Sequence, residues 1–286
     1  MKILPLASDS LGVRSMATFV ETDVKILIDP GTALGPRRYG LPPHRLELEA
    51  LDKSLEKIRK FAKKSDILII THYHYDHYIP DEPEIYKKKV LLIKHPTENI
   101  NLSQRKRAKD FLELIDDLPK SIKYADGKAF KFGNTSIKFS PAVWHGPVGS
   151  KVGKVIMVSI TDGKEKLVYG SDAQGPLDEN AVKWIIEENP DVLILDGPPT
   201  IFMGWKMKTS ILDDSIKSEI NILKNTKVKT VILEHHVVRD LKYKEKMKKV
   251  FEVAESLGKK VVNAAEFLGV EPTYLEARRK ELYENF

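Results

Sequence analysis

Three histidines and one aspartate lie within six consecutive positions, directly after a short apolar run. The segment consists of Thr71-His72-Tyr73-His74-Tyr75-Asp76-His77, and it follows Ile67-Leu68-Ile69-Ile70. Neutral imidazole is a common metal ligand, and a neighbouring carboxylate supplies negative charge that holds a divalent ion such as zinc. A histidine-rich surface turn is the alternative, but the whole chain has only eight histidines. The segment therefore predicts a metal site.

Other residues that could bind a metal follow predicted strands in the same way. They are His145 after a strand at 135–139, Asp172 after 166–168, and the pair His235-His236 after 228–233. One histidine after a strand is more often a structural residue, whereas several such places in one chain favour a shared site. Together they offer five to six imidazoles and two carboxylates, enough for two ions. Paired ions activate a bridging water for hydrolysis.

The strand that leads into the histidine segment is apolar on both faces. Residues 66–70 therefore predict a central strand in a sheet covered on both sides, with the histidines at its carboxyl end, where α/β sheets place their sites. Apolar residues at helical spacing predict a helix over residues 47–64. Further strands are predicted at residues 3–6, 16–21, 24–28, 90–93, 135–139, 154–161, 166–169, 192–195 and 228–233.

Helices are predicted between several of these strands. Asp178 is expected to cap a helix over 179–189, Asp213 or Asp214 to begin another, and Leu257-Gly258 to end one that starts near residue 242. Strand pairs mixed with crossover helices favour an α/β fold of four layers, an αββα sandwich of two mixed sheets. No repeat or linker divides the chain, so residues 1–286 are expected to form a single domain.

The composition restricts the chemistry. Cysteine is absent, so any metal must be held by nitrogen and oxygen. The 47 basic and 41 acidic residues give a net charge of +6 and a pI near 9.1, which favours anionic substrates without requiring nucleic acid. Basic runs at 87–89, 105–107 and 242–249 are interpreted as solvated faces, with a nucleic-acid-contacting face as the alternative. Abundant Lys, Glu and Ile resemble the composition of thermophile proteins.

No segment predicts export or a membrane span. The first residues lack a long apolar stretch, and no apolar run approaches the roughly 18 to 20 residues of a membrane helix. We therefore expect a cytoplasmic protein without a membrane partner. The expected partner is an anionic substrate, either a small molecule or a nucleic acid, and the sequence is compatible with a homo-oligomer.

The order of these residues resembles the metallo-β-lactamase superfamily. The similarity rests on His72-x-His74-x-Asp76-His77, followed by His145, Asp172 and His235. Asp29 at the end of a strand and Ser8-Asp9-Ser10-Leu11-Gly12 are also similar to N-terminal features of that family. The whole chain resembles an archaeal branch of predicted metallo-hydrolases within it. The resemblance implies an αββα sandwich with its site at one edge, between the two sheets.

The resemblance also implies a role for each position. His72, His74 and His145 would bind one ion, Asp76, His77 and His235 would bind the other, and Asp172 would bridge both. In flavin-linked diiron relatives a Glu stands where this chain has His74, so two Zn²⁺ ions are favoured, with Mn²⁺ or Fe²⁺ as alternatives. The last ligand is open between His235 and His236. We prefer His235, which leaves His236 as a supporting residue or as a proton donor to the leaving group.

These roles predict a hydrolase that uses a hydroxide bridging two zinc ions, with Asp76 orienting it. Two divalent ions with two aspartates leave a charge of about +2, or about +1 with the hydroxide, so an anionic substrate is expected. A phosphodiester is slightly favoured over an ester, lactone or thioester. The alternative is a non-catalytic metal- or nucleic-acid-binding protein that retains the fold.

Other residues received weaker interpretations. Arg14, Arg37, Arg38 and Lys151 are candidates for binding an anion, without a spacing argument to choose among them. Phe202, Trp205 and Met207 either line a substrate pocket or, as we favour, pack a long loop. Trp144 is expected to be a packing residue and Asp196 a supporting or turn residue. His44 and His95 are interpreted as structural or surface histidines.

Overall fold

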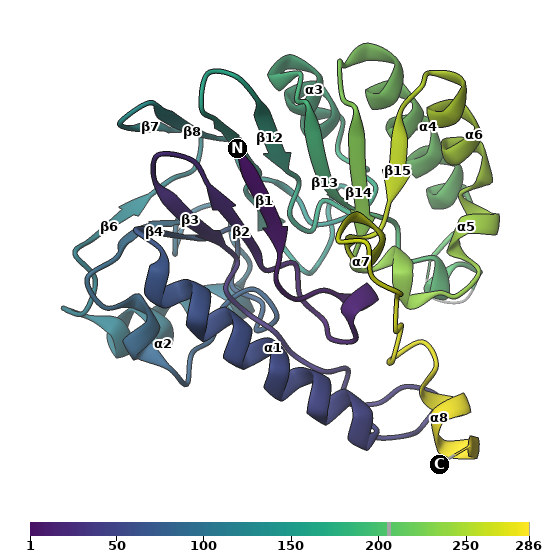
Figure 1. Cartoon of the computed structure of the whole chain (residues 1–286), viewed down its shortest axis with the longest axis horizontal. Helices are drawn as coiled ribbons and strands as arrows, with labels where there is room; N and C mark the ends of the chain where they lie inside the picture. The colour runs from purple at the N-terminus through teal and green to yellow at the C-terminus, as the bar shows by residue number, and fades with distance from the viewer. Residues whose placement is uncertain (205–206, 286) are drawn as a thin grey trace.

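The computed structural model describes residues 1–204 and 207–285, so Trp205 lies outside the described residues. Two mixed sheets face each other and helices cover both outer faces (Figure 1), which confirms the predicted α/β sandwich. The first sheet has the order β1-β2-β3-β4-β5-β6 and the second has the order β15-β14-β13-β12-β11-β8-β7. A small hairpin pairs β9 (Val143–Trp144) with β10 (Lys154–Val155).

Both sheets combine parallel and antiparallel strands. In the first, β3 to β6 run parallel and β1 and β2 are antiparallel additions. In the second, β12 to β15 run parallel and β7, β8 and β11 are antiparallel. The strands of the first sheet are β1 (Lys2–Pro5), β2 (Thr18–Glu21), β3 (Lys25–Ile28), β4 (Ile67–Ile70), β5 (Val90–Ile93) and β6 (Ser121–Tyr124). Those of the second are β7 (Ala129–Phe132), β8 (Thr135–Phe139), β11 (Val158–Thr161), β12 (Lys166–Tyr169), β13 (Val192–Asp196), β14 (Thr230–Glu234) and β15 (Lys260–Val262).

Three apolar layers hold these elements together. One lies between the sheets, a second between the first sheet and helices α1 (Arg45–Lys64) and α2 (Leu102–Ile115), and a third between the second sheet and helices α3 (Glu179–Glu188), α4 (Ser210–Asn225) and α6 (Lys248–Ser256). The central strand β4 serves two of them. Ile67 and Ile69 pack between the sheets, whereas Leu68 and Ile70 pack toward the helices. This arrangement confirms that β4 is buried on both faces.

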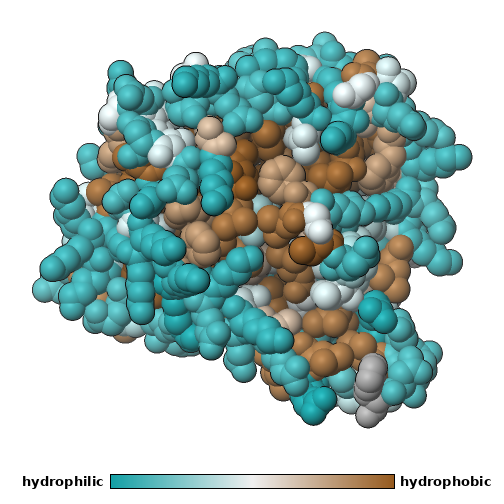
Figure 2. Space-filling model, viewed as in Figure 1, coloured by the Kyte–Doolittle hydropathy of each residue, from teal (hydrophilic) through white to brown (hydrophobic). Residues whose placement is uncertain are grey.

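The shorter elements lie near the sheet edges and the chain ends. Helix α5 (Tyr243–Lys246) lies between β14 and α6, and helices α7 (Ala264–Phe267) and α8 (Arg279–Asn285) follow β15. Helix α8 lies beside the start of α1 (Figure 1). Single turns occur at η1 (Asp9–Leu11), η2 (Pro83–Tyr86), η3 (Thr200–Phe202) and η4 (Val237–Arg239). Hydrophilic side chains cover most of the face in Figure 2, and hydrophobic ones show near its centre.

Capping residues fix where two helices begin. Asp178 accepts a hydrogen bond from the backbone of Asn180, which confirms it as the N-cap of α3. His44 caps α1 while Glu47 bonds back to the amide of His44, a reciprocal capping box. His44 is thus a structural residue, as predicted.

Three element predictions were wrong. Residues 154–161 form two strands, because the amide of Ile156 bonds the carbonyl of Thr71 and the chain passes from the hairpin into the second sheet. Helix α4 begins at Ser210, ahead of Asp213 and Asp214. The helix expected from residue 242 is divided into α5 and α6, because Met247 leaves the helical conformation, with φ −94° and ψ 12°.

Helix α2 was not predicted, since its basic run 105–107 obscured the apolar positions that it buries.

Within the described residues, none of the helices combines the length and the apolar character that a bilayer crossing requires.

Candidate metal centre

The ends of four strands bring the predicted metal-binding residues together. The histidine segment follows β4, His145 follows β9, Asp172 comes three residues after β12, and His235 comes directly after β14. Because parallel strands end at the same edge of a sheet, residues far apart in sequence meet there. The structure places all seven predicted ligands, His72, His74, Asp76, His77, His145, Asp172 and His235, within overlapping clusters.

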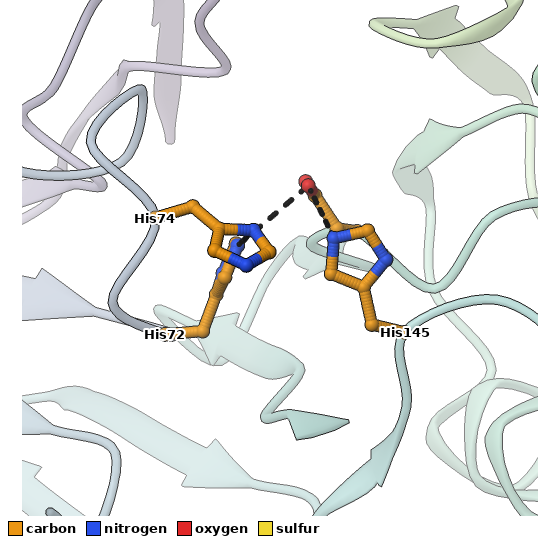
Figure 3. Close-up of side chains that lie close together, drawn as sticks. His72, His74 and His145 are labelled. Atoms are coloured by element: carbon orange, nitrogen blue, oxygen red, sulfur yellow. Dashed lines mark hydrogen bonds and ion pairs between the residues drawn. The ribbon is translucent and has the colours of Figure 1, made fainter. Parts of the chain in front are cut away.

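One cluster joins three histidines to a carboxylate. Ligand atoms of His72, His74, His145 and Asp172 lie within 4.8 Å of one another. Nε2 of His72 lies 3.1 Å from Nδ1 of His74, and Oδ2 of Asp172 lies 3.1 Å from Nε2 of His145. The three imidazoles converge from two sides of the site (Figure 3).

A second cluster lies on the other side of Asp172. It joins Asp76, His77 and His235. Nε2 of His235 lies 3.5 Å from Oδ2 of Asp76 and 3.6 Å from Oδ2 of Asp172. Oδ1 of Asp172 lies 3.0 Å from Nε2 of His77. The Asp172 carboxylate therefore contacts both clusters, and its side chain is almost fully buried.

Two turns at the site have a left-handed backbone. Ser171 has φ 49° and His235 has φ 64°, and residues other than glycine rarely adopt these backbone angles. Hydrogen bonds hold both in place: Ser171 Oγ lies 2.7 Å from Thr71 Oγ1, and the His235 amide donates to Glu234 Oε2. Backbone strain of this kind is typical of functional sites.

Burial keeps two of the histidines uncharged. It holds the pKa of His72 well below its ordinary value, and repulsion from His77 adds to the effect. Burial also lowers the pKa of His74 to about 3, with a further contribution from His145. Neutral imidazole is the form that binds a metal ion, so these two rings are ready to do so at neutral pH.

Charges control the other half of the site. Burial opposes ionisation of both His77 and Asp172, but their mutual attraction, with that of Asp29 for His77, raises the pKa of His77 and lowers that of Asp172 well beyond their ordinary values. Burial likewise opposes ionisation of Asp76, but His77 and His235 bring its pKa to about 2. The protonated ring of His77 thus supplies positive charge beside anionic carboxylates, at the place where a divalent ion would lie.

Atoms without partners show that the residues fit a divalent ion. Nε2 of His77 and Oδ1 of Asp172 are both buried, and neither has a hydrogen-bond partner among the described residues, although they face each other at 3.0 Å. Such atoms are costly unless a ligand satisfies them. The donor set of imidazole nitrogen and carboxylate oxygen suits zinc and similar ions.

Two buried carboxylates orient histidines of the clusters through the Nδ1 atom of each ring. Asp29 Oδ2 lies 2.8 Å from Nδ1 of His77 and also accepts a hydrogen bond from the hydroxyl of Thr71. Asp9 Oδ2 lies 2.7 Å from Nδ1 of His235. In both cases the ring is fixed so that Nε2 faces the clusters, an arrangement typical of histidines that bind metals.

His236 points to a different carboxylate. Its Nδ1 lies 2.8 Å from Oδ2 of Asp196, and its amide donates to Oδ1 of the same residue. Burial raises the pKa of Asp196 well above its ordinary range, and repulsion from Asp172 adds to this. Burial, with the charge of Arg239, holds the pKa of His236 well below its ordinary value. Asp196 is therefore a supporting residue of the site, as predicted.

Of the four predicted anion-binding residues, two line the cavity above the clusters. Arg14 and Lys151 contribute to its wall. Arg37 and Arg38 bond instead to backbone carbonyls, of Gly40 and Arg239. His95 accepts hydrogen bonds from the turn that follows it. Trp144 packs under the ammonium of Lys154, 4.7 Å from its ring centre.

Sequence reasoning assigned no role to two residues that support the site. Asp9 contacts His235, and the signal that could have found it is a lone carboxylate just after the first strand. Gln104 connects the loops that carry His74 and His145, through Tyr73 and Val152. It lies in α2, which was not predicted, and only the rarity of glutamine in this chain marked it.

Comparison with known proteins agrees with the fold. The family model of the β-lactamase superfamily domain matches residues 24–236, so the chain belongs to the β-lactamase superfamily. Among its relatives are UPF0282 proteins. The chain is 49% identical over 296 residues to one from Thermococcus gammatolerans, covering 99% of this chain and 95% of that protein.

Solved structures of low sequence identity share the fold. The metallo-β-lactamase fold protein YhfI from Bacillus subtilis matches with a TM-score of 0.52 and 19% identity, covering 87% of each chain. Tm1679, a metal-dependent hydrolase of the β-lactamase superfamily, matches with a TM-score of 0.53 and 16% identity, covering 91% of this chain and 94% of that one.

Proposed function

We propose that this protein is a metal-dependent hydrolase whose site holds two divalent ions. Zinc is the expected ion because the donors are nitrogen and oxygen, with Mn²⁺ and Fe²⁺ as alternatives. The proposed ligands of one ion are His72, His74 and His145, those of the other are Asp76, His77 and His235, and Asp172 would contact both.

The position of Asp172 carries the proposal. Its Oδ2 lies 3.1 Å from His145 in the first cluster, and its Oδ1 lies 3.0 Å from His77 in the second. Oδ2 also lies 3.6 Å from His235 in the second cluster, and a buried carboxylate that reaches histidines of both clusters is suited to a pair of ions. Ions bound in this way polarise a water so that it attacks a substrate at neutral pH.

The remaining roles belong to residues of the chain. Asp76 lines the cavity and its side chain is partly accessible, so its carboxylate would orient the attacking water. His236 also lines the cavity. Because its Nδ1 is engaged by Asp196, Nε2 is the atom through which it would give a proton to the leaving group.

The cavity lining favours an anionic substrate. Arg14, Lys151 and Arg239 line it together with Asp76 and Asp172, and two divalent ions would make the site cationic. A phosphodiester is favoured over an ester, lactone or thioester on this ground.

Metal analysis combined with turnover tests the proposal. The purified protein is expected to bind two equivalents of zinc and to hydrolyse bis(p-nitrophenyl) phosphate faster than p-nitrophenyl acetate. Asp172→Asn should lose both metal and activity, while Asp214→Asn, at an exposed carboxylate on α4, should lose neither. Failure to bind metal would overturn the proposal. Tight binding without turnover of either compound would favour the non-catalytic alternative.

A second pair of variants tests whether His235 or His236 is the histidine that binds the second ion. Nε2 of His235 lies 3.5 Å from Asp76 and 3.6 Å from Asp172, which supports His235 as the ligand. His236 also offers an atom to the group of Asp172 and His235 and is the alternative. His235→Ala is expected to lower metal occupancy, and His236→Ala to lower the rate at full occupancy. The opposite pattern would exchange the two roles.

A further inference from the structure

The cavity above the site is large enough for a small organic molecule. Its volume is ≈ 660 Å³, within the range that pockets for such molecules have. Its floor includes His74, Asp76, His145 and Asp172. Its sides come from two segments, the loop between β9 and β10 and the chain that follows β13.

Both sides of the cavity include apolar side chains. The loop contributes Val148, which is 68% exposed, and Val152, which is 41% exposed. The opposite side contributes Pro199, Phe202 and Met207. Exposed aliphatic side chains that face a polar site favour a ligand with an apolar part, because binding then removes apolar surface from water.

The loop that carries the two valines is held in place by backbone contacts. Gln104 donates to the carbonyl of Val152 at 2.7 Å, and Asn101 donates to the carbonyl of Lys151 at 2.8 Å. The pairing of β9 with β10 closes the base of the loop. The valine side chains are therefore presented by an anchored backbone, as a preformed wall requires.

A lysine stands between these valines. Lys151 lines the same cavity and is exposed. Two other cations of the cavity are already engaged by carboxylates, Arg14 by Glu276 at 2.6 Å and Arg239 by Asp9 at 2.7 Å. Lys151 is thus placed to attract a negative charge at the mouth of the cavity.

We infer that the substrate is a small organic anion that carries a compact apolar group. The apolar group lies between the valine loop and the side formed by Phe202 and Met207, and the negative charge lies toward Lys151 and the metal-binding floor. A polynucleotide does not suit this rim, because single strands are bound by aromatic stacking along an extended basic groove. This inference rests on the proposed hydrolase function. In that reaction the hydroxyl of water joins the electrophilic atom and its proton joins the leaving oxygen.

Calorimetry with two product-like anions tests the inference. Phenylphosphonate and methylphosphonate carry the same charged group and differ in apolar size, and each is titrated into zinc-loaded protein. We expect phenylphosphonate to bind about tenfold more tightly, which is the effect of burying roughly two carbon groups. A dodecameric single-stranded RNA is titrated alongside and is expected to bind more weakly than phenylphosphonate.

Variants of the loop connect the effect to its residues. Val148→Ser with Val152→Ser should reduce the affinity ratio of the two phosphonates by about threefold or more. Lys151→Ala should weaken both phosphonates alike, by about two- to fivefold. Val270→Ser is the control, since Val270 is 50% exposed and is not part of the cavity wall.

The outcomes separate this inference from the proposed function. Equal affinity for the two phosphonates, a ratio unchanged in the valine variant, or tighter binding of the RNA would overturn the substrate class and leave the metal site standing. Failure of the protein to bind zinc would overturn the proposed function and the inference with it, whereas zinc-loaded protein that binds neither phosphonate would overturn the inference alone.

Discussion

Asp9 and His235 are 226 positions apart in the sequence, and Oδ2 of Asp9 lies 2.7 Å from Nδ1 of His235. The other oxygen of Asp9 accepts a hydrogen bond from Nε of Arg239 at 2.7 Å. All three side chains are buried. Because the carboxylate is fixed by the arginine and the ring by the carboxylate, Nε2 of His235 is directed at Asp76 and Asp172.

Replacing Asp9 should weaken one metal position more than the other. Asp9→Asn keeps the size of the side chain but lowers its ability to hold the Nδ1 proton of His235. Losses of supporting carboxylates typically cost about 10- to 100-fold in metal affinity, so one of two zinc equivalents should weaken by that factor. Competition with a chromophoric chelator measures both equivalents. If the variant bound both zinc equivalents as tightly as the parent does, the role given to Asp9 would be wrong.

Gln104 connects the two loops that carry metal-binding residues. The side chain is fully buried, its Oε1 accepts from the amide of Tyr73 at 3.0 Å, and its Nε2 donates to the carbonyl of Val152 at 2.7 Å. Gln104→Ala leaves both backbone groups unpaired and should lower the free energy of unfolding by about 1–3 kcal/mol.

A charged variant makes this prediction sharper. Gln104→Glu keeps an acceptor for Tyr73 but places an oxygen against the carbonyl of Val152, so it should be destabilising although its shape is nearly the same. Ser103→Ala, at the exposed neighbouring position of α2, is the control and should change little. Urea unfolding of the metal-free protein measures all three variants. A stable Gln104→Glu protein would show that the donor to Val152 is unimportant.

Much of the fold follows from local patterns in the sequence. The strands β5, β8 and β12 begin and end at the predicted residues, because each is a short run of apolar or alternating residues between turns. The strand break at Ile156 could not be predicted in this way. The run from Lys154 to Thr161 is uniformly favourable for a strand, and tertiary hydrogen bonds of Ile156 to Thr71 and of Met157 to Ser140 divide it.

The candidate site shows the same contrast between local sequence patterns and tertiary contacts. The candidate ligands were predicted because histidine is rare in this chain and because each candidate lies just after a strand. The residues that support them were given no role, since the contacts of Asp9 and Gln104 depend on the folded chain. The preference for His235 over His236 as the last ligand stays a prediction, because adjacent residues share the same local pattern and both lie near Asp172.

The C-terminal helix is tied to the rest of the protein by a buried ion pair. Nε and Nη2 of Arg279 each lie 2.7 Å from an oxygen of Glu47, and both side chains are fully buried. Arg279 also donates to the carbonyls of Gly35 and Leu41. Arg279→Met leaves Glu47 buried without its partner and should lower the free energy of unfolding by about 3–5 kcal/mol.

The neighbouring arginine provides the control for this pair. Arg278 forms a similar bond with Glu281, but both side chains are largely exposed, so Arg278→Met should have little effect. Adding Glu47→Leu to Arg279→Met should recover part of the lost stability, because the unpaired charge is removed. Equal melting temperatures of the two single variants would contradict the argument.

Glu219 should make stability depend on pH from a position remote from the metal site. It is buried on α4 beside apolar residues such as Leu193 and Val250, and its Oε2 has no hydrogen-bond partner among the described residues. Burial raises its pKa well above the ordinary value of 4.5. The folded protein therefore keeps this proton at pH values where the unfolded chain has released it.

The stability that this proton supplies is present below about pH 4.5 and is lost as the pH rises through the pKa of the folded state. Glu219→Gln removes the titration, so the variant should gain stability relative to the parent as the pH rises, by up to about 1.4 kcal/mol per pH unit within that window. Urea unfolding of both proteins between pH 4 and pH 8 measures the difference. Glu252→Gln, at an exposed position of α6, should give a difference that does not change with pH. The same flat profile for Glu219→Gln would mean that the carboxylate is not kept protonated in the fold.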